Sequence, residues 1–417
     1  MPRSAPRAPG ASLAAILAVL IIAAGPAVLS RAAGLNQSFP PPTPVPPDGS
    51  LSPYPTALAT PPPGDDPPEL RAEAAALMDL DAGQVLFARD GRERRPIASL
   101  TKIMTALVVL ELVAPGDPVT ASPAAAAAPG AELGLSAGET LPARELLYAL
   151  LLQSANDAAV ALAEHVEGSV DGFVERMNDR AEALGLRDTR FFSPNGLDDR
   201  GYSSAVDLAR LTRLALDVPE IARIVETKFH DVPSPAGEAR HIQNRNALLW
   251  LYRGARGVKT GFTSAAGYCL IVAAERGGER LVAVVLGEPA QAWDDAATLM
   301  NYGFEAFERR AVVSAGDALE PVTVQGYAVP AVAGRSVYAY VDEGPVRVDV
   351  RPVGGLRLPV EEGQRLGLAV VRVGGAEIGR IPVRVGDLPE PPGTGLPLWR
   401  RVGAVLVALV GRIVTGT

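Results

Sequence analysis

Proline is concentrated in two segments of this 417-residue chain, and these segments delimit the part that can form a hydrophobic core. The first segment, 39–70, contains the runs Pro40-Pro41-Pro42 and Pro61-Pro62-Pro63, and the second spans 387–395. Proline-rich segments favour extended polyproline geometry and cannot bury a core. We therefore expect two semi-rigid spacers with the folded part of the chain between them.

The N-terminus has the pattern of a secretion signal. Arg3 and Arg7 precede an apolar run over 13–29. A charged start followed by a short apolar region is typical of an exported chain. We expect export across the cytoplasmic membrane, either with cleavage between Ala24 and Ala33 or with the segment kept as an anchor.

The C-terminus predicts contact with a membrane surface. Trp399 and Arg401 precede ten apolar residues, 402–411, which end at Arg412. Ten residues are too few to span a bilayer, but tryptophan and arginine at its edges are typical of an interfacial helix. The alternative is a tail that packs on the protein itself. The interfacial interpretation places the chain outside the cytoplasm, peripheral to the cell membrane.

The chain therefore divides into five expected parts. These are a signal peptide at 1–34, a proline-rich linker at 35–70, a large domain at 71–312, a small β-rich domain at 313–387, and a linker with an amphipathic tail at 388–417.

The large domain carries hairpin and helix patterns. Two hairpins are predicted, at 76–88 and 268–286, and helical spacing is found at 100–108, 146–152, 158–166 and 290–307. Strands and helices do not alternate as βαβ units, so we expect an α+β fold with an antiparallel sheet flanked by helices. The smaller domain shows β-rich runs separated by glycine turns, at 322–329, 336–341, 346–350, 368–373 and 380–385.

Composition excludes several classes of function. The formal charge is −8 and no block of Lys or Arg is present, which argues against a nucleic-acid partner. The single cysteine, Cys269, cannot form an intramolecular disulfide, and the three histidines are not at metal-ligand spacings. We expect no metal and no cofactor.

Lysine is rare here, and its positions are informative. Only three of the 39 basic residues are lysine, namely Lys102, Lys228 and Lys259. Lysine can lose its proton when it is desolvated, whereas arginine effectively cannot. Lysines retained in an arginine-rich chain are therefore candidates for a chemical role, although Lys228 also fits an ordinary surface position.

Ser99 and Lys102 form the first candidate pair. Residues i and i+3 share one helix face, so the Lys102 amine can reach the Ser99 hydroxyl. A serine becomes a good nucleophile when a base takes its proton, and a buried lysine can serve as that base. The alternative, a solvated surface pair, is disfavoured because the surrounding helix is apolar.

Two further motifs are ambiguous when taken alone. Ser154-Ala155-Asn156 interrupts an apolar helical stretch and could be a capping turn, or a hydroxyl and amide that face a substrate. Lys259-Thr260-Gly261 could be an exposed turn, or a carboxylate site in which Gly261 lets another backbone approach.

The three motifs in this order form the set that penicillin-recognising acyl enzymes share. The chain resembles the low-molecular-weight penicillin-binding proteins, the serine-type D-alanyl-D-alanine carboxypeptidases. The resemblance runs from about 74 to 385 and includes the stretches 96–105, 191–198 and 243–250. It implies a β-lactamase/transpeptidase-like fold, with 71–312 as the catalytic domain followed by the small β domain, and a membrane-associating tail.

The resemblance also implies a role for each motif residue. Ser99 would attack the carbonyl between two D-alanines, with Lys102 as general base and Ser154 passing a proton to the leaving group. Asn156, Lys259, Thr260, Gly261, Phe262 and Arg245 would bind the substrate, with the backbone amides of Ser99 and Phe262 forming an oxyanion hole. The partners would be peptidoglycan stem peptides that end in D-Ala-D-Ala, with β-lactams as covalent inhibitors.

Other functions remain open on the sequence. A β-lactamase of the same fold is disfavoured because no Glu-x-x-Leu-Asn segment follows Asn156. A non-catalytic peptidoglycan-binding module would not need both Ser99 and Lys102. A D,D-endopeptidase or transpeptidase would share all three motifs. Cys269 is interpreted as a small buried hydrophobic residue, with a reactive thiol near the cleft as the alternative.

Overall fold

A computed structural model describes residues 67–388, apart from 236, 291 and 341–344. The proposed signal peptide, nearly all of the first linker and the amphipathic tail lie outside the described residues. Within the described ranges, none of the helices combines the length and the apolar character needed to cross a bilayer.

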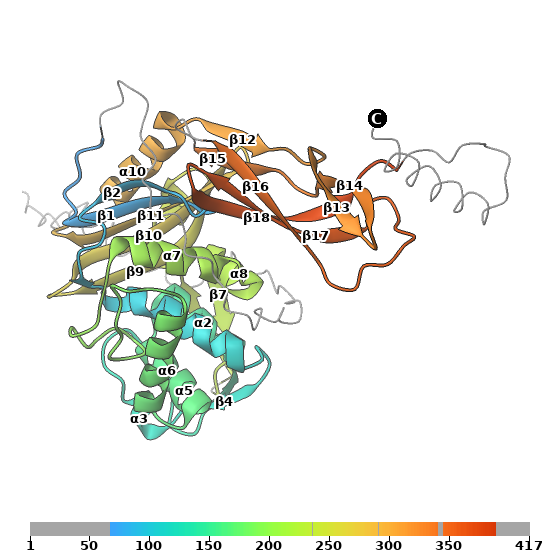
Figure 1. Ribbon diagram of the computed structural model, residues 1–417. Helices are drawn as coiled ribbons and strands as arrows, with labels where there is room; N and C mark the ends of the chain where they lie inside the picture. The colour runs from blue at the N-terminus through green and yellow to red at the C-terminus, as the bar shows by residue number, and fades with distance from the viewer. Residues whose placement is uncertain (1–66, 236, 291, 341–344, 389–417) are drawn as a thin grey trace, which may run out of the picture.

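The centre of the molecule is a five-stranded antiparallel sheet in the order β2-β1-β11-β10-β9 (Figure 1). Its strands are β1 (Ala74–Asp79), β2 (Val85–Arg89), β9 (Ala255–Thr263), β10 (Gly267–Arg276) and β11 (Glu279–Glu288). Strand β1 is buried at every position, and β10 and β11 are buried along their middles. The strands of a sheet that is covered on both faces have continuous apolar runs in their sequences. Both hairpins predicted from the sequence are present.

Alternate residues of the middle strands belong to two hydrophobic cores, one on each face of the sheet. On β11, Val282, Val284 and Leu286 join the larger core. Their neighbours Leu281, Ala283 and Val285 pack with helix α10 (Trp293–Ala306) on the opposite face. This period-two division follows from the pleat of the strand.

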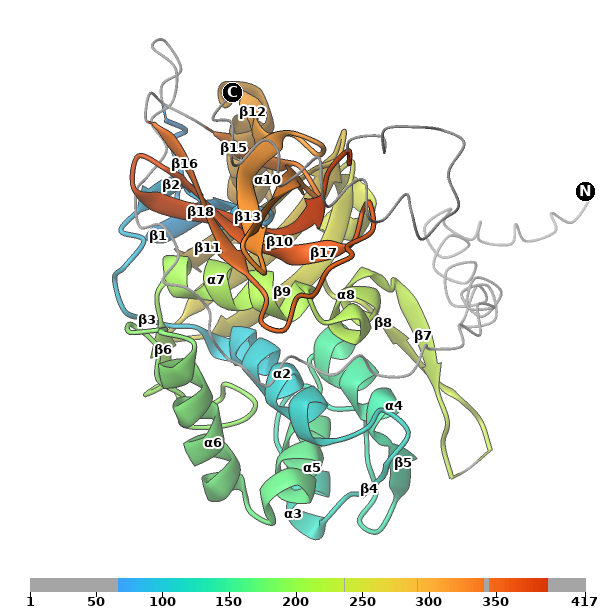
Figure 2. The same ribbon diagram turned by 45° about the vertical axis from the view of Figure 1, so that its right-hand side comes forward.

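The remaining helices and short hairpins form the larger layer. The helical segments are η2 (Ala98–Thr101), α2 (Lys102–Leu112), α3 (Pro123–Ala126), α4 (Ala143–Tyr148), η3 (Ala149–Gln153), α5 (Asn156–Glu167), α6 (Val170–Ala183), α7 (Ala205–Leu216), α8 (Pro219–Glu226) and α9 (Leu248–Leu251). The short strand pairs are β3 (Arg95–Pro96) with β6 (Tyr202–Ser203), β4 (Pro118–Thr120) with β5 (Thr140–Pro142), and β7 (Phe229–Val232) with β8 (Arg240–Gln243). Figure 2 shows the β7–β8 hairpin extending from the body beside α4 and α8.

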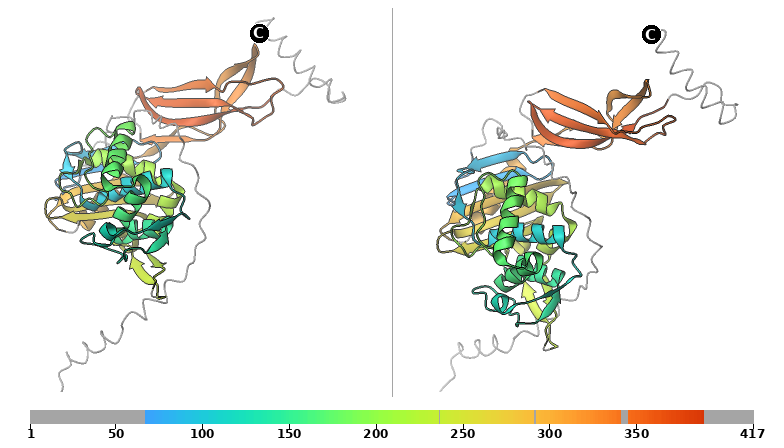
Figure 3. Two further views of the ribbon diagram at one scale, coloured as in Figure 1. Left: turned by 90° about the horizontal axis from the view of Figure 1, so that it is seen from below. Right: turned by 60° about the horizontal axis from the view of Figure 1, so that its bottom comes forward.

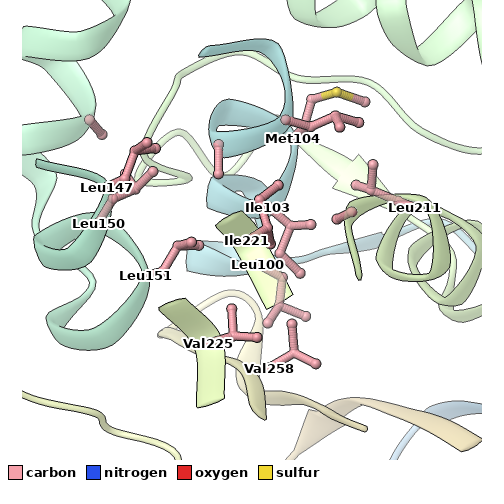
Figure 4. Packing of buried hydrophobic residues seen from close by; sticks show 14 of the residues in the cluster. Leu100, Ile103, Met104, Leu147, Leu150, Leu151, Leu211, Ile221, Val225 and Val258 are labelled. Atoms are coloured by element: carbon pink, nitrogen blue, oxygen red, sulfur yellow. The ribbon is translucent and has the colours of Figure 1, made fainter. Parts of the chain in front are cut away.

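Helix α2 lies in the middle of this layer and has no polar side over its first eight residues. Residues 102–109 are all buried, including Lys102 and Thr105. Leu100, Ile103 and Met104 pack among side chains from helices α7 and α8 and from the segment 147–151 (Figure 4). A helix that is surrounded by protein must be apolar all round, so a lysine at its start needs a specific reason.

After α10 the described chain contains only strands, as the sequence predicts. Strands β12 (Arg309–Val313) and β15 (Val337–Tyr340) pair with each other. A second five-stranded sheet has the order β13-β14-β18-β17-β16, formed by β13 (Ala318–Val324), β14 (Tyr327–Ala333), β16 (Val346–Pro352), β17 (Arg365–Val373) and β18 (Ala376–Val385). This sheet projects to one side of the larger body (Figure 3).

One sequence prediction in this region is wrong. The run 322–329 is not one strand, because β13 ends at Val324 and β14 begins at Tyr327. Gln325 and Gly326 both have positive φ, 49° and 87°. Two such residues make the tight turn that suits the twist of a hairpin.

The two bodies meet at the turn between β1 and β2. Asp81 in this turn accepts hydrogen bonds from Arg280 and Arg309. Gln84 donates to the carbonyl of Tyr340 at 2.9 Å and accepts from its amide at 3.2 Å. The pair of strands β12 and β15 is therefore fixed to the β1–β2 turn of the central sheet by these hydrogen bonds.

The other end of the central sheet contains two adjacent buried carboxyl groups. Glu288 ends β11 and is fully buried, and Asp295 lies in the first turn of α10. Asp295 accepts the amides of Arg71 at 2.5 Å and Ala72 at 2.8 Å, which ties the start of the folded chain to this helix. Burial, together with the neighbouring Asp295, raises the pKa of Glu288 to about 7. A protonated Glu288 can therefore donate to the Asp295 carboxylate.

This pair predicts a pH-dependent stability. The pKa of Glu288 is about 7 in the folded chain against an ordinary value of 4.5, so its protonated form contributes stability below about pH 4.5 that is lost as the pH rises through 7. We expect Glu288→Gln to be more stable than the parent at pH 8 and to show a flatter dependence between pH 5 and 8. Urea unfolding at several pH values between 5 and 8 measures this dependence of the free energy of unfolding. Glu308→Gln, at an exposed carboxylate paired with Arg310, should keep the parent's pH dependence. An unchanged slope in Glu288→Gln would contradict the assignment.

Candidate active site

Ser99 lies on a tight 3-10 turn directly before helix α2. The turn η2 covers Ala98–Thr101, and Ala98 has a positive φ of 47°. The amide of Leu100 donates to the carbonyl of Ile97 at 3.1 Å. The predicted helix is present, but its α-helical part begins at Lys102, so Ser99 lies in the turn that leads into it.

The amine of Lys102 is enclosed by three oxygen atoms from three parts of the chain. Nζ lies 3.0 Å from Ser99 Oγ, 2.7 Å from Asn156 Oδ1 and 2.7 Å from the carbonyl oxygen of Asn195. A neutral amine has two N–H donors and one lone pair. If it donates to Asn156 and Asn195, the lone pair is left to face the Ser99 hydroxyl. The arrangement can therefore remove the hydroxyl proton and generate a nucleophile.

Electrostatics favour the neutral form of Lys102. Its side chain is completely buried, and the loss of hydration together with the positive charges of Lys259 and Arg245 holds the pKa of Lys102 well below its ordinary value. Asp157 opposes this shift in part. The pair predicted from the spacing of Ser99 and Lys102 is thus formed, and its lysine lies in surroundings suited to a base.

Asn156 forms the opposite wall, and Ser154 lies two residues before it in the chain. The five residues Ala149–Gln153 form a π-helical turn, after which Ser154 adopts left-handed backbone angles, φ 66° and ψ 32°. Helix α5 then begins at Asn156. Asn156 accepts from Lys102 and donates through Nδ2 to the carbonyl of Pro129 at 2.7 Å. The break in the apolar helix is therefore a turn with two buried polar side chains, of which Asn156 contacts Lys102. Turns of π-helix are frequent at functional sites.

Strand β9 forms the third side. Lys259 is buried and donates to the carbonyl of Thr260 at 2.8 Å. Burial and the charge of Arg245 lower the pKa of Lys259 to about 7. Phe262 is 55% exposed and its ring lies 4.5 Å from that of Tyr268. The alternative of an exposed turn at 259–261 is therefore excluded, since these residues belong to an edge strand of the central sheet.

Two glycines allow backbone to approach the nucleophile. A Cβ on Gly261 would lie 3.1 Å from the amide nitrogen of Ser99. A Cβ on Gly196 would lie 1.9 Å from the carbonyl oxygen of Ala98, and Gly196 has φ of +79°. Strand β9 and the loop at 194–196 therefore pack closely against the turn that carries Ser99. Gly196 has no room for a side chain, and a side chain at Gly261 would require its neighbours to shift.

Arg245 lies at the rim of the site. It is exposed, and its amide donates to the carbonyl of Leu152 at 3.1 Å, which fixes it beside the π-helical turn. Its charge lowers the pKa of both Lys102 and Lys259. The structure thus brings Arg245 close enough to Lys102 and Lys259 for its positive charge to act on both amines.

Sequence reasoning missed the contributions of the loop at 194–196. Its role depends on a backbone carbonyl, that of Asn195, and on a close approach by Gly196, neither of which leaves a side-chain pattern. Thr105 on α2 supports the loop by donating to the carbonyl of Pro194 at 2.6 Å. The signal that the sequence offers for this loop is the resemblance of the stretch 191–198 to a family signature.

Cys269 is a buried residue of β10. It is 2% exposed, and burial raises its pKa to about 11. These surroundings keep the thiol protonated, as expected for a small buried hydrophobic residue. In the part of the chain that the structure describes, no group of acidic, histidine and cysteine side chains could hold a metal ion.

Comparison with known proteins gives the family. The family model for D-alanyl-D-alanine carboxypeptidases matches residues 62–290, which is 229 of the 417 residues. The chain belongs to this family. It is a member of a family of hydrolases, and its fold is that of the penicillin-binding and transpeptidase proteins.

Individual relatives agree with this assignment. The D-alanyl-D-alanine carboxypeptidase DacF of Bacillus subtilis is 31% identical over 327 residues, which cover 75% of this chain and 84% of DacF. DacB2 of Mycobacterium tuberculosis is 40% identical over 57% of this chain and 84% of its own length. The crystal structure of DacD from Francisella tularensis matches with a TM-score of 0.58 at 28% identity, covering 77% of this chain and 94% of that one. The Streptomyces K15 DD-transpeptidase matches with a TM-score of 0.55 at 34% identity, covering 58% of this chain and 99% of that one.

The close contact at Gly196 predicts a strong mutational effect in this carboxypeptidase-family chain. In Gly196→Ala the new methyl group meets the Ala98 carbonyl, so the turn carrying Ser99 has to move. We expect a loss of about 2 kcal/mol or more in the free energy of unfolding and little acylation by a fluorescent penicillin. Gly185→Ala is the matched control, because Gly185 also has positive φ, +68°, but open space around it. The control should lose about 1 kcal/mol and acylate normally. Equal losses of stability and of acylation in the two variants would refute the close contact between Gly196 and Ala98.

The charge of Arg245 predicts a shift in the pH profile of acylation. Arg245→Gln removes a positive charge that lowers the pKa of Lys102 and Lys259, so both pKa values rise. Less of Lys102 is then neutral at a given pH, and the acid limb of the acylation rate should move to higher pH. The acylation rate constant for a fluorescent penicillin, measured from pH 5 to 9, gives the position of this limb. The exposed Arg253→Gln should leave the limb in place, and an unmoved limb in Arg245→Gln would contradict the coupling.

Proposed function

We propose that the chain is a serine D-alanyl-D-alanine carboxypeptidase that removes the terminal D-alanine from peptidoglycan stem peptides through an acyl-enzyme on Ser99. The observation that carries the proposal is the buried Lys102 amine, 3.0 Å from the Ser99 hydroxyl, with its two other neighbours placed to accept its N–H groups. A base that is held neutral beside a serine is suited to acyl transfer and has no evident structural purpose.

Acylation begins when Ser99 Oγ attacks the carbonyl between the two D-alanines. Lys102 takes the hydroxyl proton, the amide C–N bond breaks, and the proton passes by way of Ser154 to the leaving amine. The amides of Ser99 and Phe262 stabilise the negative charge on the carbonyl oxygen. The close approach of Gly261 to the Ser99 amide supports this arrangement, because it places β9 directly beside the nucleophile.

The substrate is held at both sides of the scissile bond. Lys259, Thr260 and Arg245 bind the terminal carboxylate, which is attracted to this positively charged end of the cleft. Asn156 receives a substrate N–H on the second lone pair of Oδ1, since the first already accepts from Lys102. Water then hydrolyses the ester. β-Lactams acylate the same serine and leave it slowly.

The flanking segments place this chemistry at the cell envelope. We propose that residues 1–34 direct export, that 71–312 form the catalytic domain, and that 313–387 form a separate β domain. The tail at 388–417 then holds the enzyme on the outer surface of the cytoplasmic membrane. This placement rests on the sequence patterns of the two ends.

Removal of the base tests the proposal. The purified parent should release D-alanine from a peptide ending in Lys-D-Ala-D-Ala. Lys102→Ala keeps the nucleophile but loses the base, so we expect release to fall by about 10³-fold or more. Free D-alanine is measured by a coupled oxidase assay.

Fluorescent penicillin labelling separates the alternatives. A folded parent that takes up the penicillin but releases no D-alanine would move the substrate to another wall peptide. Fast turnover of nitrocefin would instead identify a β-lactamase. A folded parent with neither release nor uptake would overturn the acyl-enzyme mechanism.

A further inference from the structure

A pocket of about 360 Å³ lies where the central sheet meets strands β12, β15 and β18. We call it the junction pocket, because both bodies of the molecule contribute to its lining. The charged residues of the lining are Asp81, Arg213, Asp217 and Arg280 from the larger body, and Arg309 and Arg335 from the strands after α10. None of the lining residues belongs to the proposed active site.

The lining of the junction pocket carries more positive than negative charge. Its four arginines are shared between two aspartates. Asp81 accepts hydrogen bonds from Arg280 and Arg309. The other three pairings are electrostatic, since the charges of three of the arginines act on Asp217. The lining therefore has a formal excess of two positive charges, which favours an anionic ligand.

Arg309 is the arginine whose charge is offset most. Besides Asp81, two carboxylates outside the lining, Asp79 and Glu279, act on it. Its Nε is nevertheless buried and has no hydrogen-bond partner among the described residues. A buried polar group without a partner needs an explanation, and a bound ion nearby is one of them. The uncompensated charge of the pocket rests mainly on the other three arginines of the lining.

Backbone carbonyls hold two of these arginines in place. Arg213 donates to the carbonyls of Leu80 at 2.7 Å and Asp81 at 3.0 Å. Arg335 donates to the carbonyl of Arg380 at 2.6 Å. A carbonyl orients a guanidinium group without cancelling its charge, so these contacts prepare the two side chains for an anion that reaches both.

An exposed aromatic ring completes the lining. Tyr338 on β15 is 40% exposed, and the guanidinium carbon of Arg309 lies 4.5 Å from the centre of its ring. The pocket is also larger than a simple anion needs. An aromatic ring beside a cluster of cations suits a ligand that combines an anionic group with a ring that has an apolar face.

We propose that the junction pocket binds a sugar phosphate. Arg213, Arg280 and Arg335 hold the phosphate monoester, and the sugar ring packs against Tyr338. A monoester dianion matches the excess of two positive charges. Its three terminal oxygens can accept from guanidinium groups that approach from several directions, whereas a planar carboxylate offers fewer such directions. The arginines come from both bodies, so a bound ligand ties the strands after α10 to the larger body. This binding is separate from the proposed peptidase reaction and does not depend on it.

Calorimetric titration of the purified chain with four probes tests the site. Glucose 1-phosphate should bind with a dissociation constant of about 1 mM or lower, and inorganic phosphate should bind more weakly. Glucose, which lacks the charge, should not bind, and malonate, which carries two carboxylates, should bind at least about tenfold more weakly than glucose 1-phosphate. Arg335→Gln should weaken both phosphate probes by about tenfold, because a charge-assisted hydrogen bond is lost. Tyr338→Ala should weaken only glucose 1-phosphate, by about fivefold.

Matched controls separate this site from general damage and from nonspecific charge. Arg347→Gln removes an exposed arginine of β16 outside the lining and should change neither phosphate affinity. Arg335 is itself exposed, so Arg335→Gln should keep the parent's melting temperature without ligand and its acylation by a fluorescent penicillin. The site is refuted if neither phosphate probe binds up to about 20 mM, if malonate binds as tightly as glucose 1-phosphate, or if the Arg335 and Arg347 variants bind alike. Penicillin labelling and D-alanine release test the acyl-enzyme separately, so either proposal can fail alone.

Discussion

The burial of the Lys102 amine is the constraint on which the rest of the site depends. An ammonium ion without water is costly inside a protein, and the cost falls when the group is neutral and its N–H donors are satisfied. The acceptors come from α5, through Asn156, and from the loop at 194–196, through the carbonyl of Asn195. The helical layer and both of these segments must be assembled before the lysine can be held as a base. The fold therefore serves to bring together short pieces that are 54 and 93 residues away in sequence.

In the proposed mechanism, the cations that bind the substrate carboxylate also tune the base. Arg245 and Lys259 lower the pKa of Lys102 while they supply the positive charge that a terminal carboxylate requires. A substrate carboxylate placed between them offsets part of this charge, which raises the pKa of Lys102. The neutral amine is then a stronger proton acceptor, while a smaller fraction of Lys102 is neutral at a given pH. The proton affinity of the base and the binding of a carboxylate are therefore electrostatically linked.

Much of this arrangement could be predicted from the sequence, and the remainder has identifiable physical reasons for being hidden. The pairing of Ser99 with Lys102 follows from helical spacing, and the two β hairpins of the central sheet follow from apolar runs with a turn between them. The carbonyl of Asn195 and the close approach of Gly196 involve backbone alone, which gives no periodic pattern. The β7–β8 hairpin was not predicted, since Phe229–Val232 and Arg240–Gln243 are short and half polar. The turn at Gln325 and Gly326 was hidden within one apolar run because only one of its two residues is glycine.

In the proposed mechanism, Arg245 determines how the leaving-group end of the cleft recognises a substrate. A carboxypeptidase that recognised its substrate only by the small size of alanine would need a closed wall beyond the carboxylate. In the proposed mechanism the carboxylate is recognised by charge, and a hollow with polar and apolar lining residues adjoins Arg245. Charge recognition fixes the position of the leaving residue but places no limit on its side chain.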